Sequence, residues 1–457
     1  MTAQSPDQVY PIGMSTQEMV DTCKNHTIYT WSAGNGVNPL PIAHAEGCYI
    51  YTPEGQKILD FNAQLMSVLI GHQHPTVIAA MKKQIDELIF VYPQTATAVR
   101  ARLAKLLAEV VPGMTSFFFT LGGAEANENA IKMARQFTGR QKILSRYRSY
   151  HGGTNLTMML TGDPRRWSSE PGAPGIIRVF DPSPYNFSFG QTDEEIVDNY
   201  MVYLEETIQY ENPSAIAAMI VETVTGTNGL LIPPKNWFPR LRKLLDKYGI
   251  LLICDEVMAG MGRTGKMMAY EHFDVIPDIT TMAKGLTSSY FPLGAIGVRQ
   301  EIHDFFQKNT FYGGLTYNSH PVGLATAESV IHVMQDQGMI ENASKMQHVM
   351  RGHMDRLQAK HPSFAEGRCI GLFGMIDIRK NSKAVGRSRG EAIAPYNGSH
   401  PKMNELSAFL RKEGLFTFVR WSSFTCNPPI CITPEQLAEG FDIIDRGLDI
   451  TDQAFEG

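Results

Sequence analysis

The stretch GILLICDE, residues 249–256, combines an apolar run with two acids at its end. Consecutive apolar residues are typical of a strand that helices cover on both faces of a parallel sheet. The segment TTMAKGL (280–286) follows it in the chain and contains Lys284. The pattern predicts that Asp255 and the Lys284 amine lie at the ends of neighbouring buried strands.

An amine and a carboxylate in that arrangement are the two groups that pyridoxal phosphate requires from a protein. The lysine binds the aldehyde of the cofactor covalently, and the acid pairs with its ring nitrogen. Neither residue is informative alone, because most lysines are solvated and many α/β strands end in aspartate. The hypothesis of a pyridoxal phosphate site therefore depends on the rest of the chain.

Composition limits the class of protein. A chain of 457 residues exceeds one hydrophobic core, so we expect more than one domain. A net charge of −5 argues against a nucleic acid or an anionic membrane as the main partner. The N-terminal stretch MTAQSPDQVYPIGMSTQEM (1–19) has no leader pattern, and no apolar run reaches membrane-spanning length. Six scattered cysteines without a CxxC pair indicate reduced thiols, so we expect a cytoplasmic protein with no metal site.

Short apolar runs alternate with helical patterns between residues 76 and 335, which is typical of a mostly parallel sheet covered by helices. The strands predicted there are 117–120, 142–145, 215–221, 250–254 and 295–298. Outside this region we predict a hairpin of 48–51 with 57–61, strands at 372–378 and 416–419, and a closing helix at 434–450. The prediction is an α/β protein with a large domain at 76–335. A smaller α+β domain would combine 336–457 with the N-terminal arm, 1–75.

Ligands of open parallel sheets bind beyond the carboxyl ends of the strands. There Gly122 and Gly123 open a predicted helix that ends near Gly139, and backbone amides at a helix start can hold a phosphate. A tight turn would explain these glycines equally well. Tyr150, in the segment YHGG, could stack on a planar cofactor or simply pack in the core. Glu222 is either a carboxylate at the edge of the sheet or a solvated surface acid.

Taken together, these segments resemble those of the class III aminotransferases, which are pyridoxal phosphate enzymes of fold type I. The resemblance covers nearly the whole chain, and its specificity comes from several motifs in the same order. They are NAQLMSVLIGHQHP (62–75), GGAEANENAIKMAR (122–135), YHGG (150–153), DKYGILLICDEVMAGMGRTG (246–265), TTMAKGLTSSYFPLGA (280–295), GGLTYNSHPVG (313–323) and RCIGLFGMIDI (368–378).

The resemblance implies roles for single residues. Lys284 would form an aldimine with the cofactor and later act as the base that moves a proton, while Asp255 would keep the ring nitrogen protonated. The other cofactor contacts that it implies are Gly122, Gly123, Ala124, Tyr150, His151, Glu222, Val257 and Thr316, the last from a neighbouring subunit of a homodimer or a dimer of dimers. Many relatives have Ser-Gly-Ser where this chain has Gly-Gly-Ala, and proline where it has Thr223. Backbone amides would therefore carry phosphate recognition here.

Substrate choice depends on Arg420, which matches the family's arginine for an α-carboxylate. A surface ion pair is the alternative for this residue. When an amine without an α-carboxylate binds, we expect Arg420 to pair with Glu222 or to swing outwards. Trp31 and Trp421 would wall an apolar pocket beside it.

We therefore expect a ping-pong ω-aminotransferase that uses a terminal amine donor and a 2-oxo acid, pyruvate or 2-oxoglutarate. Donors with a distal anion, such as taurine or β-alanine, are favoured over long diamines. Two alternatives stay open. One is an aminomutase, racemase or decarboxylase with the same cofactor, and the other is a non-catalytic protein that keeps the fold.

Overall fold

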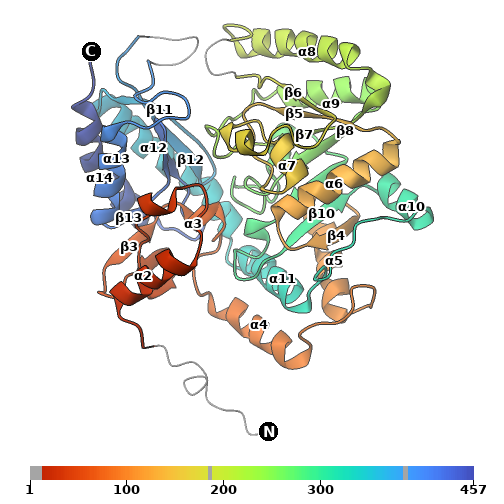
Figure 1. Ribbon diagram of the computed structural model, residues 1–457, viewed down its shortest axis with the longest axis horizontal. Coiled ribbons are helices and arrows are strands. Elements are labelled where there is room, and N and C mark those ends of the chain that lie inside the picture. The colour runs from red at the N-terminus through yellow and green to blue at the C-terminus, as the bar shows by residue number, and fades with distance from the viewer. Residues whose placement is uncertain (1–12, 184–187, 384–389) are drawn as a thin grey trace.

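The computed structural model describes residues 13–183, 188–383 and 390–457, and its elements gather into two lobes (Figure 1). One lobe contains a seven-stranded sheet, and the other contains two four-stranded sheets. The first twelve residues of the predicted N-terminal arm lie outside the described residues.

The seven-stranded sheet is mostly parallel, as predicted. Its order is β4-β10-β9-β8-β7-β5-β6. The strands are β4 (Ser116–Thr120), β5 (Lys142–Arg146), β6 (Ile176–Val179), β7 (Ile216–Glu222), β8 (Leu251–Asp255), β9 (Ile279–Met282) and β10 (Gly294–Val298). Only β10 runs against its neighbours β9 and β4 within this described sheet. The short edge strand β6 was not predicted, and the sequence prediction gave no bounds for β9.

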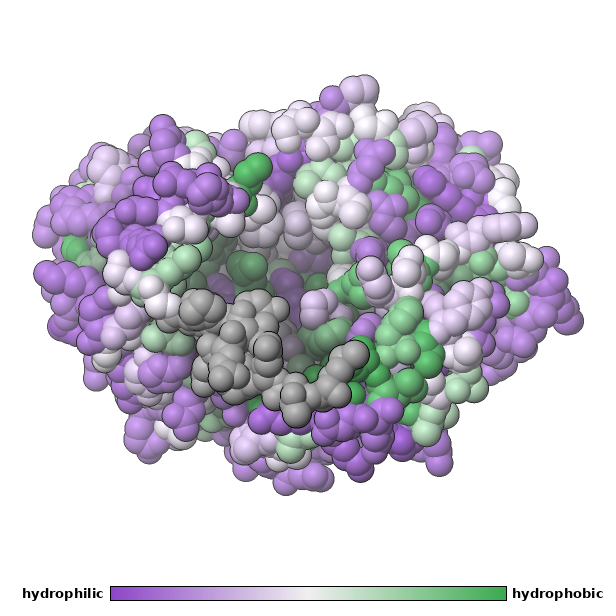
Figure 2. All heavy atoms as spheres, turned by 60° about the horizontal axis from the view of Figure 1, so that its bottom comes forward, coloured by the Kyte–Doolittle hydropathy of each residue, from purple (hydrophilic) through white to green (hydrophobic). Residues whose placement is uncertain are grey.

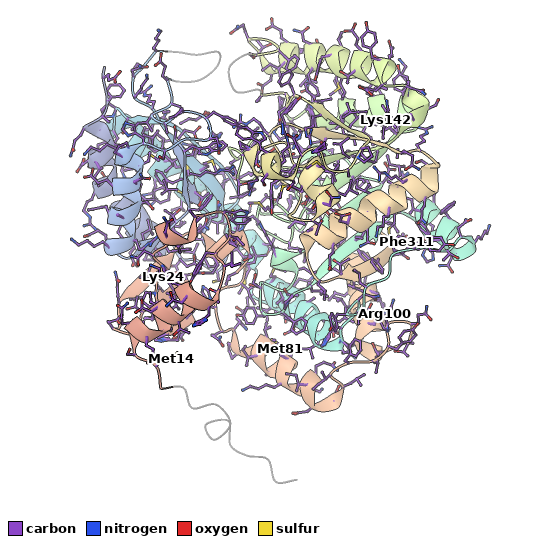
Figure 3. The ribbon with its side chains drawn as sticks, in the orientation of Figure 1. Met14, Lys24, Met81, Arg100, Lys142 and Phe311 are labelled. Carbon is purple, nitrogen blue, oxygen red and sulfur yellow. The ribbon has the colours of Figure 1, made fainter. Side chains whose placement is uncertain are left out.

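Helices cover both faces of this sheet, so its central strands face two hydrophobic cores. On β8, Ile253 packs in one core, while Leu252 and Cys254 pack in the other. Successive side chains of a strand point to opposite faces, which explains why the sequence of β8 is apolar at every position. Phe311, labelled in Figure 3, closes one edge by packing against Phe118 of β4 and Phe306.

The α-helices of the described chain lie between and around these strands in sequence. They are α2 (Thr16–His26), α3 (Ala63–Met66), α4 (Pro75–Glu87), α5 (Ala98–Val110), α6 (Gly123–Thr138), α7 (Asn155–Leu160), α8 (Asp193–Tyr210), α9 (Trp237–Tyr248), α10 (Gln300–Lys308), α11 (Pro321–Asp336), α12 (Met339–Lys360), α13 (Pro401–Lys412) and α14 (Pro434–Asp452). The predicted end of α6 at Gly139 is confirmed, because this residue has the left-handed φ of 70° that glycine tolerates. None of the helices in the described ranges is long and apolar enough to cross a membrane.

The second lobe combines both ends of the chain. One sheet joins β1 (His44–Glu46), β2 (Tyr49–Tyr51) and β3 (Lys57–Asp60) to β13 (Leu415–Phe416). The other joins β11 (Phe364–Ile370), β12 (Phe373–Ile378), β15 (Ser423–Cys426) and β14 (Val419–Arg420). The single strand predicted at 416–419 is wrong, because the chain crosses from one sheet to the other after Phe416. The domain boundaries after residues 75 and 335 stay our proposal.

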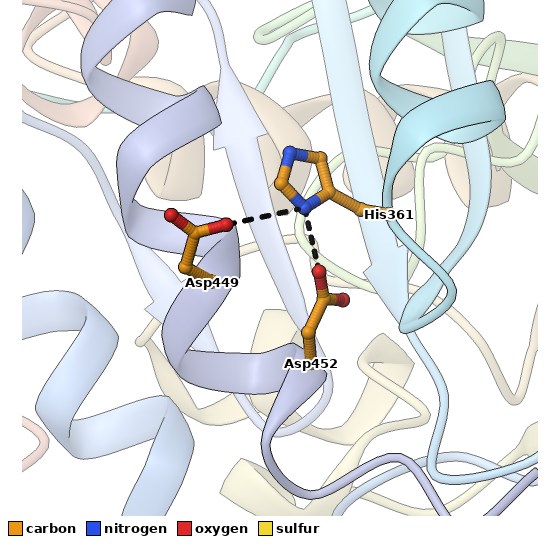
Figure 4. Close-up of side chains that lie close together, drawn as sticks. All are labelled: His361, Asp449 and Asp452. Carbon is orange, nitrogen blue, oxygen red and sulfur yellow. Dashed lines mark hydrogen bonds and ion pairs between the residues drawn. The ribbon is translucent and has the colours of Figure 1, made fainter.

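A buried histidine ties the end of α12 to the C-terminal helix α14. His361 Nδ1 lies 2.7 Å from Asp452 Oδ2 and 3.9 Å from Asp449 Oδ1 (Figure 4). Its other ring nitrogen lies 2.9 Å from Asp445 Oδ1. Three carboxylates of one helix therefore surround one imidazole and hold the two helices together.

Candidate active site

A cavity of about 840 Å³ opens between the two lobes, where Figure 2 shows the molecule hollowed. Its walls come from the N-terminal segment, from the carboxyl ends of the central strands and from residues near β14. It brings together nearly all the predicted site residues: Trp31, Gly122, Gly123, Ala124, Tyr150, His151, Glu222, Asp255, Val257, Lys284, Arg420 and Trp421. Thr316 does not line the cavity of its own chain and is exposed.

Lys284 reaches the cavity because of an unusual backbone conformation. It lies two residues after β9 and opens the short 3₁₀ turn Lys284–Leu286 with a φ of 41°, in the left-handed region. The next residue, Gly285, packs so closely that a Cβ there would lie 2.9 Å from Leu69 Cδ2. Burial lowers the pKa of Lys284 to about 8, although the negative charges of Asp255 and Glu222 oppose this shift. The neutral share of the amine near physiological pH is therefore much larger than that of an ordinary lysine.

Asp255 ends β8, and hydrogen bonds fix the orientation of its carboxylate. Asn127 Nδ2 donates to Oδ2 at 2.8 Å, and His151 Nδ1 lies 2.8 Å from the same oxygen. Oδ1 accepts a hydrogen bond from the backbone amide of Val257 at 3.1 Å. Thr281 in turn donates to Asn127 Oδ1 at 2.7 Å. The buried acid is thus held rigidly.

The sequence prediction gave Asn127 no role, although the quoted glycine-rich motif contains it. Its position one helical turn after Gly123 was the available signal, because that spacing turns both residues toward the same side of α6. Nε2 of His151 is buried and has no hydrogen-bond partner among the described residues.

Glu222, at the end of β7, is held by backbone amides. Its Oε1 accepts from Tyr150 at 2.9 Å, and its Oε2 accepts from Gly226 at 2.9 Å. Burial raises the pKa of Glu222, and the neighbouring Asp255 adds to this effect. The pairing of Glu222 with Arg420 that we expect when an amine donor binds stays a prediction. Arg420 Nη2 lies 3.1 Å from Asp163 Oδ2.

Asp163 links two arginines at the cavity wall. Arg165 donates to it through Nε at 2.8 Å and through Nη2 at 2.6 Å, and Arg165 Nη2 also donates to Thr227 Oγ1 at 3.0 Å. Burial alone would raise the pKa of Asp163, but the hydrogen bonds and charge of Arg165, together with Arg420, hold it below its usual value. Two guanidinium groups thus share one buried carboxylate.

Asp163 and Arg165 were missed in the sequence. They belong to TGDPRRW (161–167), where Asp163 caps the short 3₁₀ helix Pro164–Ser169. An acid followed by proline and two arginines is a signal for a local ion pair, but nothing in the sequence places it beside Arg420.

Aromatic side chains form the wall next to Arg165. Its guanidinium lies 3.7 Å from the ring centroid of Tyr150, which meets Trp31 edge to face at 6.3 Å. Trp421 lies under the guanidinium of Arg420 at 4.2 Å. The predicted pocket wall of Trp31 and Trp421 therefore carries two cations as well as apolar surface.

The start of α6 gives the cavity a place for an anion. Gly122 caps this helix with no side-chain hydrogen bond, and Ala124 offers no hydroxyl, so backbone amides must bind any ligand there. A Cβ at position 123 would lie 2.9 Å from Val257 Cγ1, so a larger residue there would force Val257 to shift. An amine, a fixed acid and a helix N-terminus around one cavity fit pyridoxal phosphate.

The chain belongs to the class III aminotransferases, since the model of that family matches residues 31–448. Enzymes of this family use pyridoxal phosphate. The chain is therefore a transaminase, and it has the α/β architecture of fold type I.

Similar proteins differ in their amine donors. The chain is 32% identical over 428 residues to a putrescine–pyruvate aminotransferase of Pseudomonas aeruginosa, covering 90% of each chain. It is 36% identical to the solved taurine:2-oxoglutarate aminotransferase of Bifidobacterium kashiwanohense in complex with pyridoxal phosphate and glutamate, with a TM-score of 0.91 over 96% of this chain and 99% of that one. An (S)-enantioselective ω-transaminase of Thermomicrobium roseum is 32% identical, with a TM-score of 0.88 over 96% and 99%.

Proposed function

We propose that this transaminase moves an amino group from an ω-amino donor with a distal anion, such as taurine or β-alanine, to pyruvate or 2-oxoglutarate. The observation that carries the proposal is the pair of arginines on Asp163. Two positive charges share one negative charge, so this part of the cavity wall keeps a net positive charge. Such a wall attracts a sulfonate or carboxylate and repels the second ammonium group of a diamine.

Pyridoxal phosphate supplies an aldehyde that condenses with amines and a ring that accepts the electron pair left on the substrate carbon. Lys284 would hold the cofactor through Nζ and, once the substrate amine displaces it, move a proton at the substrate carbon. Asp255, fixed by Asn127 and His151, would keep a proton on the ring nitrogen. We thus propose for Lys284 and Asp255 the same roles that the family resemblance implies.

The remaining residues would position the cofactor. The amides of Gly122, Gly123 and Ala124 would bind the phosphate at the start of α6. Val257 and Tyr150 would contact the two faces of the ring. His151 and Glu222 would act by holding Asp255 and the backbone of Tyr150 in place.

Two arginines would each bind a different anionic group of the substrates. Arg420 would bind the α-carboxylate of the 2-oxo acid, and Arg165 would bind the distal anion of the donor. Asp163 would balance the charge of Arg420 when a donor without an α-carboxylate is bound, which is the part that the sequence hypothesis gave to Glu222. Trp31 and Trp421 would enclose the short carbon chain between them.

Steady-state kinetics with the holoenzyme test this assignment. With either 2-oxo acid, we expect a higher kcat/KM for taurine and β-alanine than for putrescine. Arg165→Met should lower kcat/KM for the anionic donors by about 10- to 100-fold, since a charge-assisted hydrogen bond contributes roughly 1.5–3 kcal/mol. The same variant should leave n-butylamine, which has no distal charge, nearly unaffected.

Arg166→Met is the matched control, because Arg166 pairs with Glu170 and does not line the cavity. It should keep the donor preference of the wild type. The donor assignment is refuted if putrescine is the best substrate, or if Arg165→Met slows anionic and uncharged donors equally.

We also propose a homodimer in which Thr316 of the partner subunit completes the phosphate site. Large apolar side chains are exposed around the turn between α4 and α5, where Figure 2 shows hydrophobic residues beside the hollow. They include Ile85, Ile89, Phe90 and Tyr92, and Tyr317 lies next to Phe90 and directly follows Thr316. Such a contiguous patch is typical of a protein interface.

The six free cysteines support a cytoplasmic location.

A further inference from the structure

Two cysteines from opposite ends of the chain meet in the smaller lobe. The Sγ atoms of Cys48 and Cys431 are 3.6 Å apart, although 383 positions separate the residues in sequence. Cys48 directly precedes β2, and Cys431 lies between β15 and α14. Cys48 is buried, whereas Cys431 is partly exposed. These two and the four other cysteines are all free thiols in this structure.

The surroundings make Cys431 the more reactive sulfur of the pair. A hydrogen bond from Cys48 lowers the pKa of Cys431 and outweighs the opposing effect of burial, and the positive charge of Arg263 lowers it further. The same hydrogen bond, together with burial, raises the pKa of Cys48. Arg263 is fully buried, and its Nε and Nη2 have no hydrogen-bond partner among the described residues. A thiolate at Cys431 would offset this buried charge.

We propose that Cys48 and Cys431 form an oxidisable dithiol, which hydrogen peroxide converts into a disulfide. In the first step, the Cys431 thiolate attacks a peroxide oxygen, the O–O bond breaks, and hydroxide leaves while Cys431 becomes a sulfenic acid. In the second step, the Cys48 sulfur attacks the Cys431 sulfur, the S–O bond breaks, and the hydroxyl group leaves with the Cys48 proton as water. Two thiols are oxidised for each peroxide that is reduced.

The backbone around the pair suits this reaction. The two sulfurs must approach by about 1.5 Å to reach the bond length of a disulfide. Gly47 precedes Cys48 in a turn with a φ of 55°. Gly71 lets the chains pack closely, since a Cβ there would lie 2.9 Å from both Cys431 Sγ and Gly47 O.

The bond would restrain a segment that is connected to the active site. Ile430, next to Cys431, donates its amide to Leu69 O at 2.8 Å. The residue after Leu69, Ile70, donates its backbone amide to Ser288 Oγ at 3.0 Å, in the loop after Lys284. A disulfide would thus fasten both ends of the chain beside this loop. A covalent link across so long a loop also stabilises the folded protein.

Titration of the holoenzyme with hydrogen peroxide tests the proposal. We expect the first two thiols lost to be Cys48 and Cys431, with a mass loss of two hydrogens and a Cys48–Cys431 peptide in the tryptic map. The oxidised protein should unfold at a higher temperature than the reduced one, and dithiothreitol should reverse the shift. Cys23→Ser, which leaves the pair intact, should behave like the wild type.

Two variants separate the steps. Cys48→Ser should stop at a sulfenic acid on Cys431, which dimedone traps, and Cys431→Ser should show neither the adduct nor the shift in Tm. The proposal is overturned if another cysteine is oxidised first without this cross-link. It is also overturned if Cys431 proceeds to the sulfinic acid while Cys48 in the wild-type protein stays reduced.

Discussion

At the scale of single residues, the chemistry of this site depends on how Lys284 is presented. Its positive φ and the close packing of Gly285 direct the amine into the cavity, where burial favours the neutral form. The nearby carboxylates of Asp255 and Glu222 limit this effect, so the pKa falls only to about 8. The reactivity of the amine should therefore change within the ordinary working range of pH.

The pH dependence of cofactor capture by the apoenzyme should reveal this pKa. Only the neutral amine attacks an aldehyde, and it is the form that dominates above a pKa of about 8. Between pH 7 and pH 9 the neutral fraction rises from roughly one tenth to roughly nine tenths, so the rate of capture should rise about ninefold. Stopped-flow absorbance measures this rate. Lys284→Arg should form no borohydride-stable adduct, and a flat rate over this range would contradict the shifted pKa.

Some residues of the cavity could be proposed from the sequence, and others could not. Asp255 was proposed because it ends a recognisable apolar strand, and Lys284 because its segment follows that strand in the chain and matches a family motif. Asp163 and Arg165 lie in a short 3₁₀ segment without periodicity, and their partner Arg420 is more than 250 residues away in the chain. Only folding brings this ion-pair network to the cavity.

At the scale of elements, the two glycines at the start of α6 differ in the space that surrounds them. Gly122 is extended, with a φ of −169°, and a Cβ there would meet nothing within 4 Å. A Cβ on Gly123 would press against Val257 at 2.9 Å. The first glycine therefore tolerates alanine, whereas the second keeps the helix close to the proposed ring site.

Substitution of each glycine by alanine should separate these requirements. Gly123→Ala should weaken the binding of pyridoxal phosphate about tenfold, equivalent to roughly 1.4 kcal/mol, because Val257 must shift. Gly122→Ala should bind it nearly as well as the wild type, since its amide is retained and its Cβ has room. Titration of the two apoenzymes with the cofactor gives both dissociation constants. Equal losses in the two variants would contradict this account.

Element prediction succeeded where burial imposes a continuous pattern. The strands β7 and β8 are buried at every position, and their apolar sequences predicted them. The edge strand β6 and the hairpin strand β11 lack such a pattern and were missed. The segment 416–419 is apolar throughout, but its ends pair with different sheets, which no local pattern can specify.

At the scale of the whole molecule, the cavity depends on contacts between distant parts of the chain. Residues 30–32 and 418–421 wall a cavity whose floor comes from the large sheet. Thr316 indicates a role for quaternary structure, because it is exposed and does not line the cavity of its own chain. A homodimer would bring Thr316 of the partner subunit to the phosphate.

Sedimentation of surface variants should test the proposed dimer. Ile89→Glu places a charge within the exposed apolar patch and should shift the protein toward monomer, because an unpaired charge in an interface is costly. The monomer should also bind pyridoxal phosphate more weakly. Val202→Glu, at an exposed position on α8, is the matched control and should sediment like the wild type. A stable, fully active wild-type monomer would refute the dimer.

The sequence by itself predicted the fold class and, through motifs that resemble those of a family, the cofactor, and it led us to propose Lys284 and Asp255 as the central residues. These follow from local information, because burial of a strand and the turn at its end are encoded in adjacent residues. Tertiary structure alone decided that Asp163 accompanies Arg420, and that Cys48 meets Cys431. Such pairings depend on how distant segments pack, and a pattern within one segment carries no record of its partner.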